Sequence, residues 1–218
     1  MGFRFRTGRF VLSALMLAIA APAAASAQIT ASGPLNVNVV RSQDTNCFSC
    51  YGSISVFGSN DFSFFWWFTG GMWRASVTAG TQMGIKVASG RFAKRFDSGE
   101  VMSDAGDFGS SLSYDLSQYY PYDYYWLGEY GRQSGYLGIS GGCPGGICLG
   151  WIEVSTPLSA EAGASISIRG WAYNSTPGAP IMAGQTTVVP EPSTYALLAA
   201  GLASLGAMSL RRRHSPMA

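Results

Sequence analysis

Short runs in which apolar and polar residues alternate recur along most of the chain. In the first run, Leu35, Val37 and Val39 alternate with Asn36 and Asn38, and this period of two is typical of a half-buried strand. The other candidate strands are rich in aromatic and β-branched residues, and they are Gly52–Phe57, Phe62–Phe68, Trp73–Ala79, Met83–Ala88, Gly135–Ser140, Leu149–Val154 and Ser165–Tyr173. Clusters of glycine, serine, asparagine and aspartate separate these runs, as expected for tight turns.

This pattern predicts an all-β domain. Many short strands joined by glycine-rich turns are typical of an antiparallel β-sandwich or a jelly-roll-like fold, and a closed barrel stays open as a variant. Five aromatic residues stand between Phe62 and Phe68, including Trp66 and Trp67. Because consecutive strand residues face opposite sides, this segment predicts a central strand with two apolar faces.

The N-terminus has the three parts of a secretory signal peptide. A segment with three arginines precedes an uncharged apolar run over Phe10–Ala21, and small residues follow that run. Ala25 and Ala27 fit the small-residue cleavage site, so Gln28 is the expected first residue of the mature chain.

The C-terminus combines a polar signature, an apolar run and a basic cluster. The signature is Pro190, Glu191 and Pro192, and its prolines keep it extended and outside any helix that follows. The uncharged run over Tyr195–Leu210, extended back to Ser193, is barely long enough for a helix that spans a bilayer. The basic cluster is Arg211, Arg212 and Arg213, which would hold this end on the cytoplasmic side.

These three elements, over residues 188–213, resemble the PEP-CTERM sorting segment of Gram-negative bacteria. The resemblance implies that an exosortase-type membrane protease recognises the Pro190–Pro192 tripeptide and releases or transfers the protein to the cell exterior. It also implies an inner-membrane intermediate held by the C-terminal helix, followed by a location at the envelope surface or in the extracellular matrix. A plain C-terminal membrane anchor is the alternative interpretation.

The chain is therefore expected to contain four parts: a signal peptide (1–27), a β-domain (28–187), a sorting segment (188–213) and a short cytoplasmic tail (214–218). The whole chain has a formal charge of +2, but six of its 14 basic residues lie in the terminal segments. The stretch from 28 to 189 has eight basic and eleven acidic side chains, a net charge of −3. We therefore expect no nucleic-acid partner for the domain.

The four cysteines form two closely spaced pairs, Cys47 with Cys50 and Cys143 with Cys148. In an oxidising compartment this even number predicts disulfides, for which three connectivities are open. The Pro-Gly-Gly insert between Cys143 and Cys148 lets the chain reverse, which favours a local bond there. A four-thiolate zinc site is the alternative, but zinc ribbons hold their two pairs much closer along the chain. We predict no metal and no cofactor.

Most catalytic arrangements lack an essential residue. His214 is the only histidine, so Ser–His and Cys–His nucleophiles have no base within the domain. Gly138–Gly142 matches the Gly-x-Ser-x-Gly pattern, but without a histidine it is expected to be a glycine-rich turn. A glycoside hydrolase-like enzyme needs only two carboxylates, for which Glu129 and Glu153 are candidates, so it stays open as the alternative function.

A tyrosine-rich segment between Tyr114 and Tyr136 is the candidate contact surface. Tyrosine on a loop can stack on a sugar or on a protein face while its hydroxyl stays hydrated. The residues proposed for a glycan or protein contact are Tyr119, Tyr122, Tyr124 and Trp126. A core strand or a lid over a sheet edge is the other interpretation. The sequence thus favours a non-catalytic, exported structural or adhesive protein with extracellular polysaccharide as a partner.

Overall fold

The computed structural model of this chain describes residues 28–41, 50–58, 60–69, 71–103, 108–109, 113–120, 125–131, 133–157, 161–187, 200–202 and 204. Sixteen strands are found in these residues, and a single turn of helix over 200–202 lies apart from them. No helix in these ranges is long and apolar enough to cross a membrane. Most of the predicted span over Tyr195–Leu210 lies outside the described residues.

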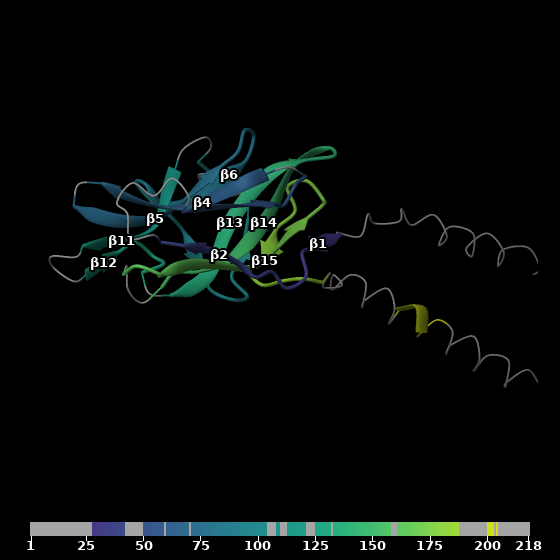
Figure 1. Cartoon of the computed structure of the whole chain (residues 1–218). Coiled ribbons are helices and arrows are strands. Elements are labelled where there is room, and N and C mark those ends of the chain that lie inside the picture. The colour runs from purple at the N-terminus through teal and green to yellow at the C-terminus, as the bar shows by residue number, and fades with distance from the viewer. Residues whose placement is uncertain are drawn as a thin grey trace, which may run out of the picture.

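Fourteen strands form a single sheet, which is antiparallel apart from one parallel pairing of β7 with β11. Its main path runs in the order β1, β15, β14, β13, β6, β7, β11, β5, β4, β3, while β2, β8, β10 and β12 pair alongside (Figure 1). The long strands are β4 (Asn60–Thr69), β5 (Met72–Ala79), β6 (Gly84–Ser89), β11 (Ser113–Tyr120), β13 (Ser134–Cys143), β14 (Gly146–Ser155) and β15 (Ser165–Asn174). The short ones are β1 (Ile29–Ala31), β2 (Val37–Val40), β3 (Tyr51–Ser55), β7 (Phe92–Ala93), β8 (Arg95–Phe96), β10 (Phe108–Gly109) and β12 (Tyr125–Leu127).

The sheet curls into two facing halves, and β6 is the strand that joins them. Ile85 near the start of β6 pairs with Ile139 of β13, whereas Val87 and Ser89 pair with β7 and are separated by a pairing irregularity. The irregularity lets β6 turn from one half to the other. We call these halves the β14 half (β1, β2, β15, β14, β13) and the β4 half (β11, β5, β4, β3).

The main core lies between the two halves. From the β4 half, Phe62, Phe64 and Trp66 are exposed by 2% or less. From the β14 half, the buried residues of the same cluster are Val39, Leu137, Ile139, Ile152, Val154, Ile166 and Ile168. The alternation seen in the sequence places these side chains on one face of each strand, so both inner faces are apolar.

The two ends of the curled sheet meet through a side chain. The indole Nε1 of Trp66 on β4 donates a hydrogen bond of 3.0 Å to the backbone oxygen of Val39 on β2. Next to this contact, the Arg41 guanidinium lies 3.8 Å from the centre of the Trp73 ring. The all-β prediction is therefore confirmed, and the two layers belong to one continuous curled sheet.

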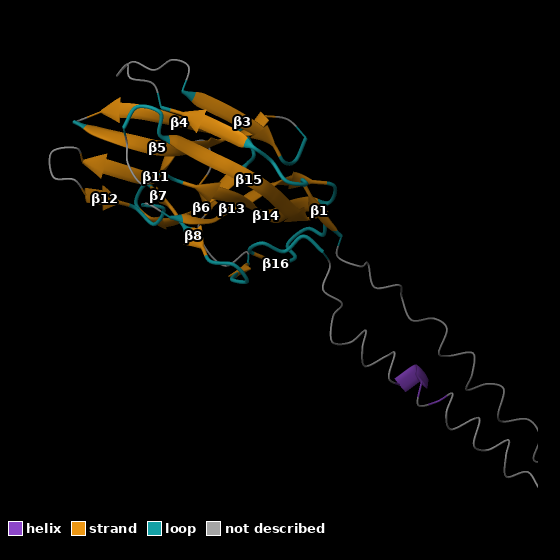
Figure 2. Ribbon diagram, turned by 60° about the horizontal axis from the view of Figure 1, so that its bottom comes forward, coloured by secondary structure: helices purple, strands orange, loops and turns teal. Residues whose placement is uncertain are grey.

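A second, smaller core covers the outer face of the β14 half. There β9 (Val101–Met102) and β16 (Ile181–Met182) form a two-stranded sheet, which lies at the opposite side of the domain from β3 and β4 (Figure 2). The buried residues of this core are Phe96, Met102, Leu149, Trp151, Ala172, Ile181 and Ala183.

The Phe62–Phe68 segment has the two apolar faces that the sequence predicts, but only one of them is buried in the core. Phe65 and Trp67, whose side chains alternate with those of the core, are only partly buried on the outer face. Among the described residues, no further layer of strands covers this outer face.

Candidate functional site

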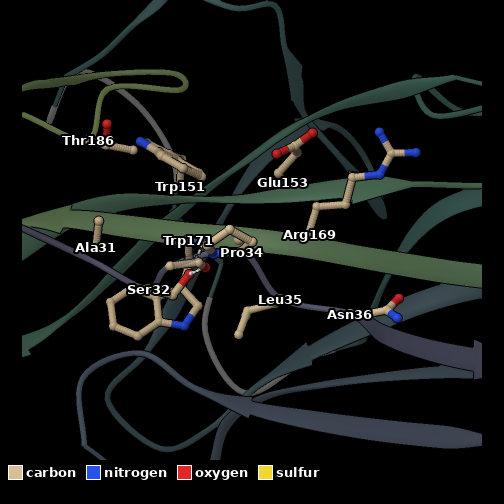
Figure 3. A pocket seen from close by; sticks show the side chains of 12 residues that line it. Ala31, Ser32, Pro34, Leu35, Asn36, Trp151, Glu153, Arg169, Trp171 and Thr186 are labelled. Atoms are coloured by element: carbon tan, nitrogen blue, oxygen red, sulfur yellow. Dashed lines mark hydrogen bonds between the residues drawn. The ribbon is translucent and has the colours of Figure 1, made fainter.

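A cavity of about 690 Å³ lies beside β14 and β15, and we call it the groove (Figure 3). Its lining comes from residues 31–36, which connect β1 to β2, from Trp151 and Glu153 of β14, from residues 169–171 of β15, and from Thr186. The groove is thus formed where the β1–β2 connection crosses the edge of β15.

A β-bulge in β15 shapes this part of the molecule. Glu153 pairs with Gly170, but the next residue of β14, Val154, pairs with Ile168, so Arg169 is the extra residue. The bulge reverses which side chains face inward. Ile166 and Ile168 belong to the main core before the bulge, and Trp171 packs against the same core after it.

The connection over residues 32–36 is held to the bulged strand by two backbone hydrogen bonds and one to a serine hydroxyl. Ser32 N donates to Trp171 O at 2.9 Å, and Trp171 N donates to Ser32 Oγ at 3.0 Å. Leu35 N donates to Arg169 O at 2.7 Å. These hydrogen bonds preform one wall of the groove.

Two tryptophans are among the lining residues of the groove. Trp151 is nearly buried, its Nε1 donates to Gln185 O at 3.1 Å, and its ring makes an edge contact of 5.2 Å with Tyr136. Trp171 is partly exposed and stacks at 6.1 Å on Tyr173. These contacts fix the orientation of both indoles.

Glu153 and Arg169 supply the charged groups of the groove. Figure 3 shows the two side chains projecting to the same side of β15, with Trp171 on the other side. Within the described part of the chain, neither Glu153 nor Arg169 takes part in an ion pair. The carboxylate and the guanidinium therefore keep their hydrogen-bonding capacity for a bound molecule.

The two glutamates considered for paired-carboxylate chemistry are not brought together in the groove. Glu129 is exposed, and its Oε2 accepts a hydrogen bond of 2.6 Å from the backbone nitrogen of Arg95. Among the described residues that line the groove, Glu153 is the sole acid.

The structure confirms the local disulfide between Cys143 and Cys148, whose Cα atoms are 5.8 Å apart at the tip of the β13–β14 hairpin. This bond contradicts the four-thiolate zinc alternative, because both thiols are consumed. Cys50 is disulfide-bonded as well, and Cys47 lies outside the described residues. In the described ranges, no three residues of the His, Cys, Asp and Glu types gather where they could hold a metal ion.

Gly138–Gly142 is not a turn but the middle of β13. Its glycines leave room for neighbouring side chains, since a Cβ on Gly141 would lie 2.4 Å from the ring of Phe57. The expectation of a turn was wrong because close packing against a strand, like a turn, requires glycine.

The tyrosine-rich segment is a hairpin of β11 and β12 rather than a loop. Tyr119 is partly buried and packs against the main core, and its backbone pairs with that of Trp126. Tyr122 and Tyr124 lie outside the described residues. Tyr130 at the end of the segment is wholly buried. Tyr119 and Tyr130 thus pack inward, and the contact proposed for Tyr122, Tyr124 and Trp126 stays a prediction.

The predicted processing residues lie mostly beyond the part of the chain that the structure describes. This holds for Ala25, Ala27, Pro190, Glu191, Pro192, Arg211, Arg212 and Arg213. Gln28 is described, and its backbone oxygen accepts hydrogen bonds of 2.8 Å from both N and Oγ of Ser175. The residue expected to begin the mature chain is thus tied into the fold.

Comparison with known proteins identifies one segment of the chain. A family model described as the PEP-CTERM protein-sorting motif matches residues 188–213. No curated protein and no solved structure matches the chain. The resemblance found in the sequence is therefore confirmed, and the motif indicates an exported protein that an exosortase sorts at the cell envelope.

Proposed function

We propose that this protein is a non-catalytic structural or adhesive component of the extracellular matrix, and that its mature domain binds extracellular polysaccharide in the groove. The observation that carries the proposal is the groove itself, where the unpaired side chains of Glu153 and Arg169 lie on the same side of the sheet as the fixed indole of Trp151.

This combination of groups suits a sugar. A carboxylate accepts hydrogen bonds from hydroxyl groups, and a guanidinium donates to ring and hydroxyl oxygens. The apolar face of a sugar ring can lie against Pro34 and Leu35, which belong to the groove wall and keep exposed surface. A preformed wall also reduces the entropy that is lost when a chain molecule binds.

The sorting motif supports a route to that partner. In our proposal the C-terminal helix holds the exported chain in the inner membrane until the exosortase-type protease acts at the motif. The processed domain then resides at the envelope surface or in the extracellular matrix. Thr186 lines the groove and the matched motif begins at residue 188, so the groove lies close to the segment that is processed.

A carbohydrate-active enzyme is the less supported function. Hydrolysis of a glycosidic bond with two carboxylates needs both groups within about 5 to 10 Å of each other across one cleft. Among its described lining residues, the groove offers Glu153 alone.

The proposal is tested with the double variant Glu153→Gln/Arg169→Ala, produced in its native host from the full chain. We expect its matrix-associated fraction to fall by about tenfold at an unchanged melting temperature, because lost charged hydrogen bonds weaken binding but remove no ion pair of the fold. The matched control is Lys94→Ala/Glu100→Gln, which makes the same chemical changes in an exposed ion pair of 3.4 Å. A double groove variant that stays with the matrix as the wild type does would overturn the proposal.

A further inference from the structure

The outer face of the β4 half carries a second group of aromatic and charged side chains. We call it the outer platform and define it by Tyr51, Phe65, Trp67, Arg91 and Ser113. It faces away from the main core, on the half of the sheet opposite the half that bears the groove.

Three aromatic residues form a row on this face. Tyr51 of β3 is the direct cross-strand partner of Phe65 of β4, so their side chains share a face. Trp67 follows Phe65 by two positions and lies on the same face. Tyr51 is 67% exposed, and Phe65 and Trp67 are partly exposed. The row therefore offers flat apolar surface to solvent.

A buried carboxylate lies under one end of this row. Asp115 of β11 is fully buried, and its Oδ2 lies 2.6 Å from Arg74 Nη1 and 3.0 Å from Arg91 Nε. Gln118 Nε2 donates to the same oxygen at 2.6 Å, and Ser76 Oγ donates to Oδ1 at 2.7 Å. Asp115 thus has partners for both oxygens and serves to hold the two arginines.

Trp67 is fixed by the same network. Its Nε1 donates to Ser76 Oγ at 2.8 Å, and its ring centre lies 5.2 Å from the Arg74 guanidinium and 5.6 Å from that of Arg91. The indole and the guanidinium of Arg91 are therefore held side by side in a defined geometry.

Within this network, Arg91 is the residue that keeps hydrogen-bond donors available for a ligand. Its side chain is 48% exposed, and Nε is the atom that contacts Asp115. The two terminal nitrogens make no hydrogen bond or ion pair within the described part of the chain. Together with Phe65, Trp67 and Ser113, Arg91 lines a cavity of about 480 Å³.

The local charge differs in sign from that of the domain. Arg74 and Arg91 share one carboxylate, so the network has a net charge of +1 within a domain whose net charge is −3. A terminal guanidinium edge matches the geometry of a carboxylate, and the aromatic row next to it matches the face of a sugar ring.

We infer that the outer platform binds an acidic polysaccharide, with sugar rings stacked along the row from Tyr51 to Trp67 and a uronate carboxylate on Arg91. This inference rests on the proposed function, because it names the class of polysaccharide that the protein takes, but its site is distinct from the groove. Two sites on opposite halves of one domain would let a single molecule bridge two polysaccharide chains.

The test measures binding of the purified full chain to two probes, alginate as a polyuronate and dextran as a neutral glucan. We expect alginate to bind, and we expect Arg91→Ala to lower the affinity by about tenfold. Arg91→Lys should retain part of the affinity, because the lysine ammonium still supplies a positive charge but not the paired donors of a guanidinium. Tyr51→Ala should lower affinity about fivefold and Tyr51→Phe should keep it, because the ring and not the hydroxyl makes the contact. Since Tyr51 is largely exposed, neither change at Tyr51 should alter the melting temperature.

Two controls make the result decisive. Lys94→Ala removes an exposed positive charge that lines neither site, and it should leave alginate affinity within a factor of two of the wild type. Equal losses in Arg91→Ala and Lys94→Ala would show a general charge effect and would overturn the inference, as would unchanged alginate affinity in a folded Tyr51→Ala variant. Matrix association of the groove variant Glu153→Gln/Arg169→Ala is measured separately, so failure of the groove and failure of the outer platform are distinguishable.

Discussion

Asp115 Oδ2 lies 2.6 Å from Arg74 Nη1, and the aspartate side chain has no solvent exposure although its strand presents it to the outer face of the sheet. Arg74, Arg91 and Trp67 supply the contacts around it. A buried carboxylate stays ionised only when both of its oxygens have ion-pair or hydrogen-bond partners, because an unpaired buried charge is costly in free energy. The relationship therefore links the stability of β5 and β11 to the orientation of Arg91.

Asp115→Ala should lower the free energy of unfolding by about 3 kcal/mol, because it leaves the largely buried Arg74 without its counter-ion. Urea unfolding at neutral pH measures this change. Glu100→Ala is the matched control, since Glu100 pairs with Lys94 at an exposed position and its loss should cost less than about 1 kcal/mol. Equal losses in the two variants would contradict the structural role of Asp115.

The Cys143–Cys148 bond should stabilise the β13–β14 hairpin by a modest amount. Cys143→Ser/Cys148→Ser should lower the free energy of unfolding by about 2 kcal/mol, because the closed loop is short. Peptide mapping under non-reducing conditions should recover the two cysteines in one linked fragment, and the exported protein should have no free thiol and no bound zinc. Recovery of stoichiometric zinc with titratable thiols would restore the metal-site hypothesis.

Tyr130 should make stability fall at high pH. Burial raises the pKa of its phenol well above the ordinary value; Glu129 adds to this rise and Arg95 opposes it. Above about pH 10 the unfolded chain loses this proton while the folded chain keeps it, so stability falls with rising pH by up to about 1.4 kcal/mol per unit. Urea unfolding across this range should show a shallower fall for Tyr130→Phe than for the wild type. Parallel curves for the two proteins would contradict the burial of a protonated phenol.

The strands with strict alternation are those that the sequence predicts well. In β5, for example, Trp73, Ala75 and Val77 alternate with polar residues, so the existence of the strand and its inner face follow from the residues alone. In contrast, the sequence of β11 leaves a contact loop, a lid and a core strand open as interpretations. Tyr114 and Leu116 do alternate with Asp115 and Ser117, but a charged residue and several tyrosines obscure a core strand.

The candidate sites depend on pairing between strands that are far apart in the sequence, and no local sequence pattern reveals this pairing. Strict alternation in β15 would place Gly170 and Ala172 on the same face as Ile168, whereas the bulge at Arg169 turns Trp171 and Tyr173 inward. The outer platform similarly needs β7 and β11 to meet, which brings Arg91 to Asp115 across the sheet. The composition shows that aromatic residues and arginines are present, but it does not show how the fold arranges them.

Sorting and export should be separable. Replacing Pro190, Glu191 and Pro192 together with alanine should leave signal-peptide cleavage intact while the uncleaved tail keeps the protein in the inner membrane. The physical reason is that an apolar helix followed by arginines suffices for anchoring, whereas the tripeptide serves recognition. Cell fractionation with intact-mass analysis measures both events. A triple variant that reached the cell exterior without its tail would contradict the role of the tripeptide.

Cosedimentation of the processed protein with extracellular polysaccharide purified from its own host, followed by sizing of that polysaccharide, measures both binding and cleavage by the mature domain. We expect saturable cosedimentation and a polysaccharide of unchanged length after prolonged incubation, because the domain binds without cleaving. The double groove variant and Arg91→Ala should each cosediment less, and Lys94→Ala/Glu100→Gln should behave as the wild type. A folded protein that stays in the supernatant, or one that shortens the polysaccharide, would contradict a non-catalytic matrix role.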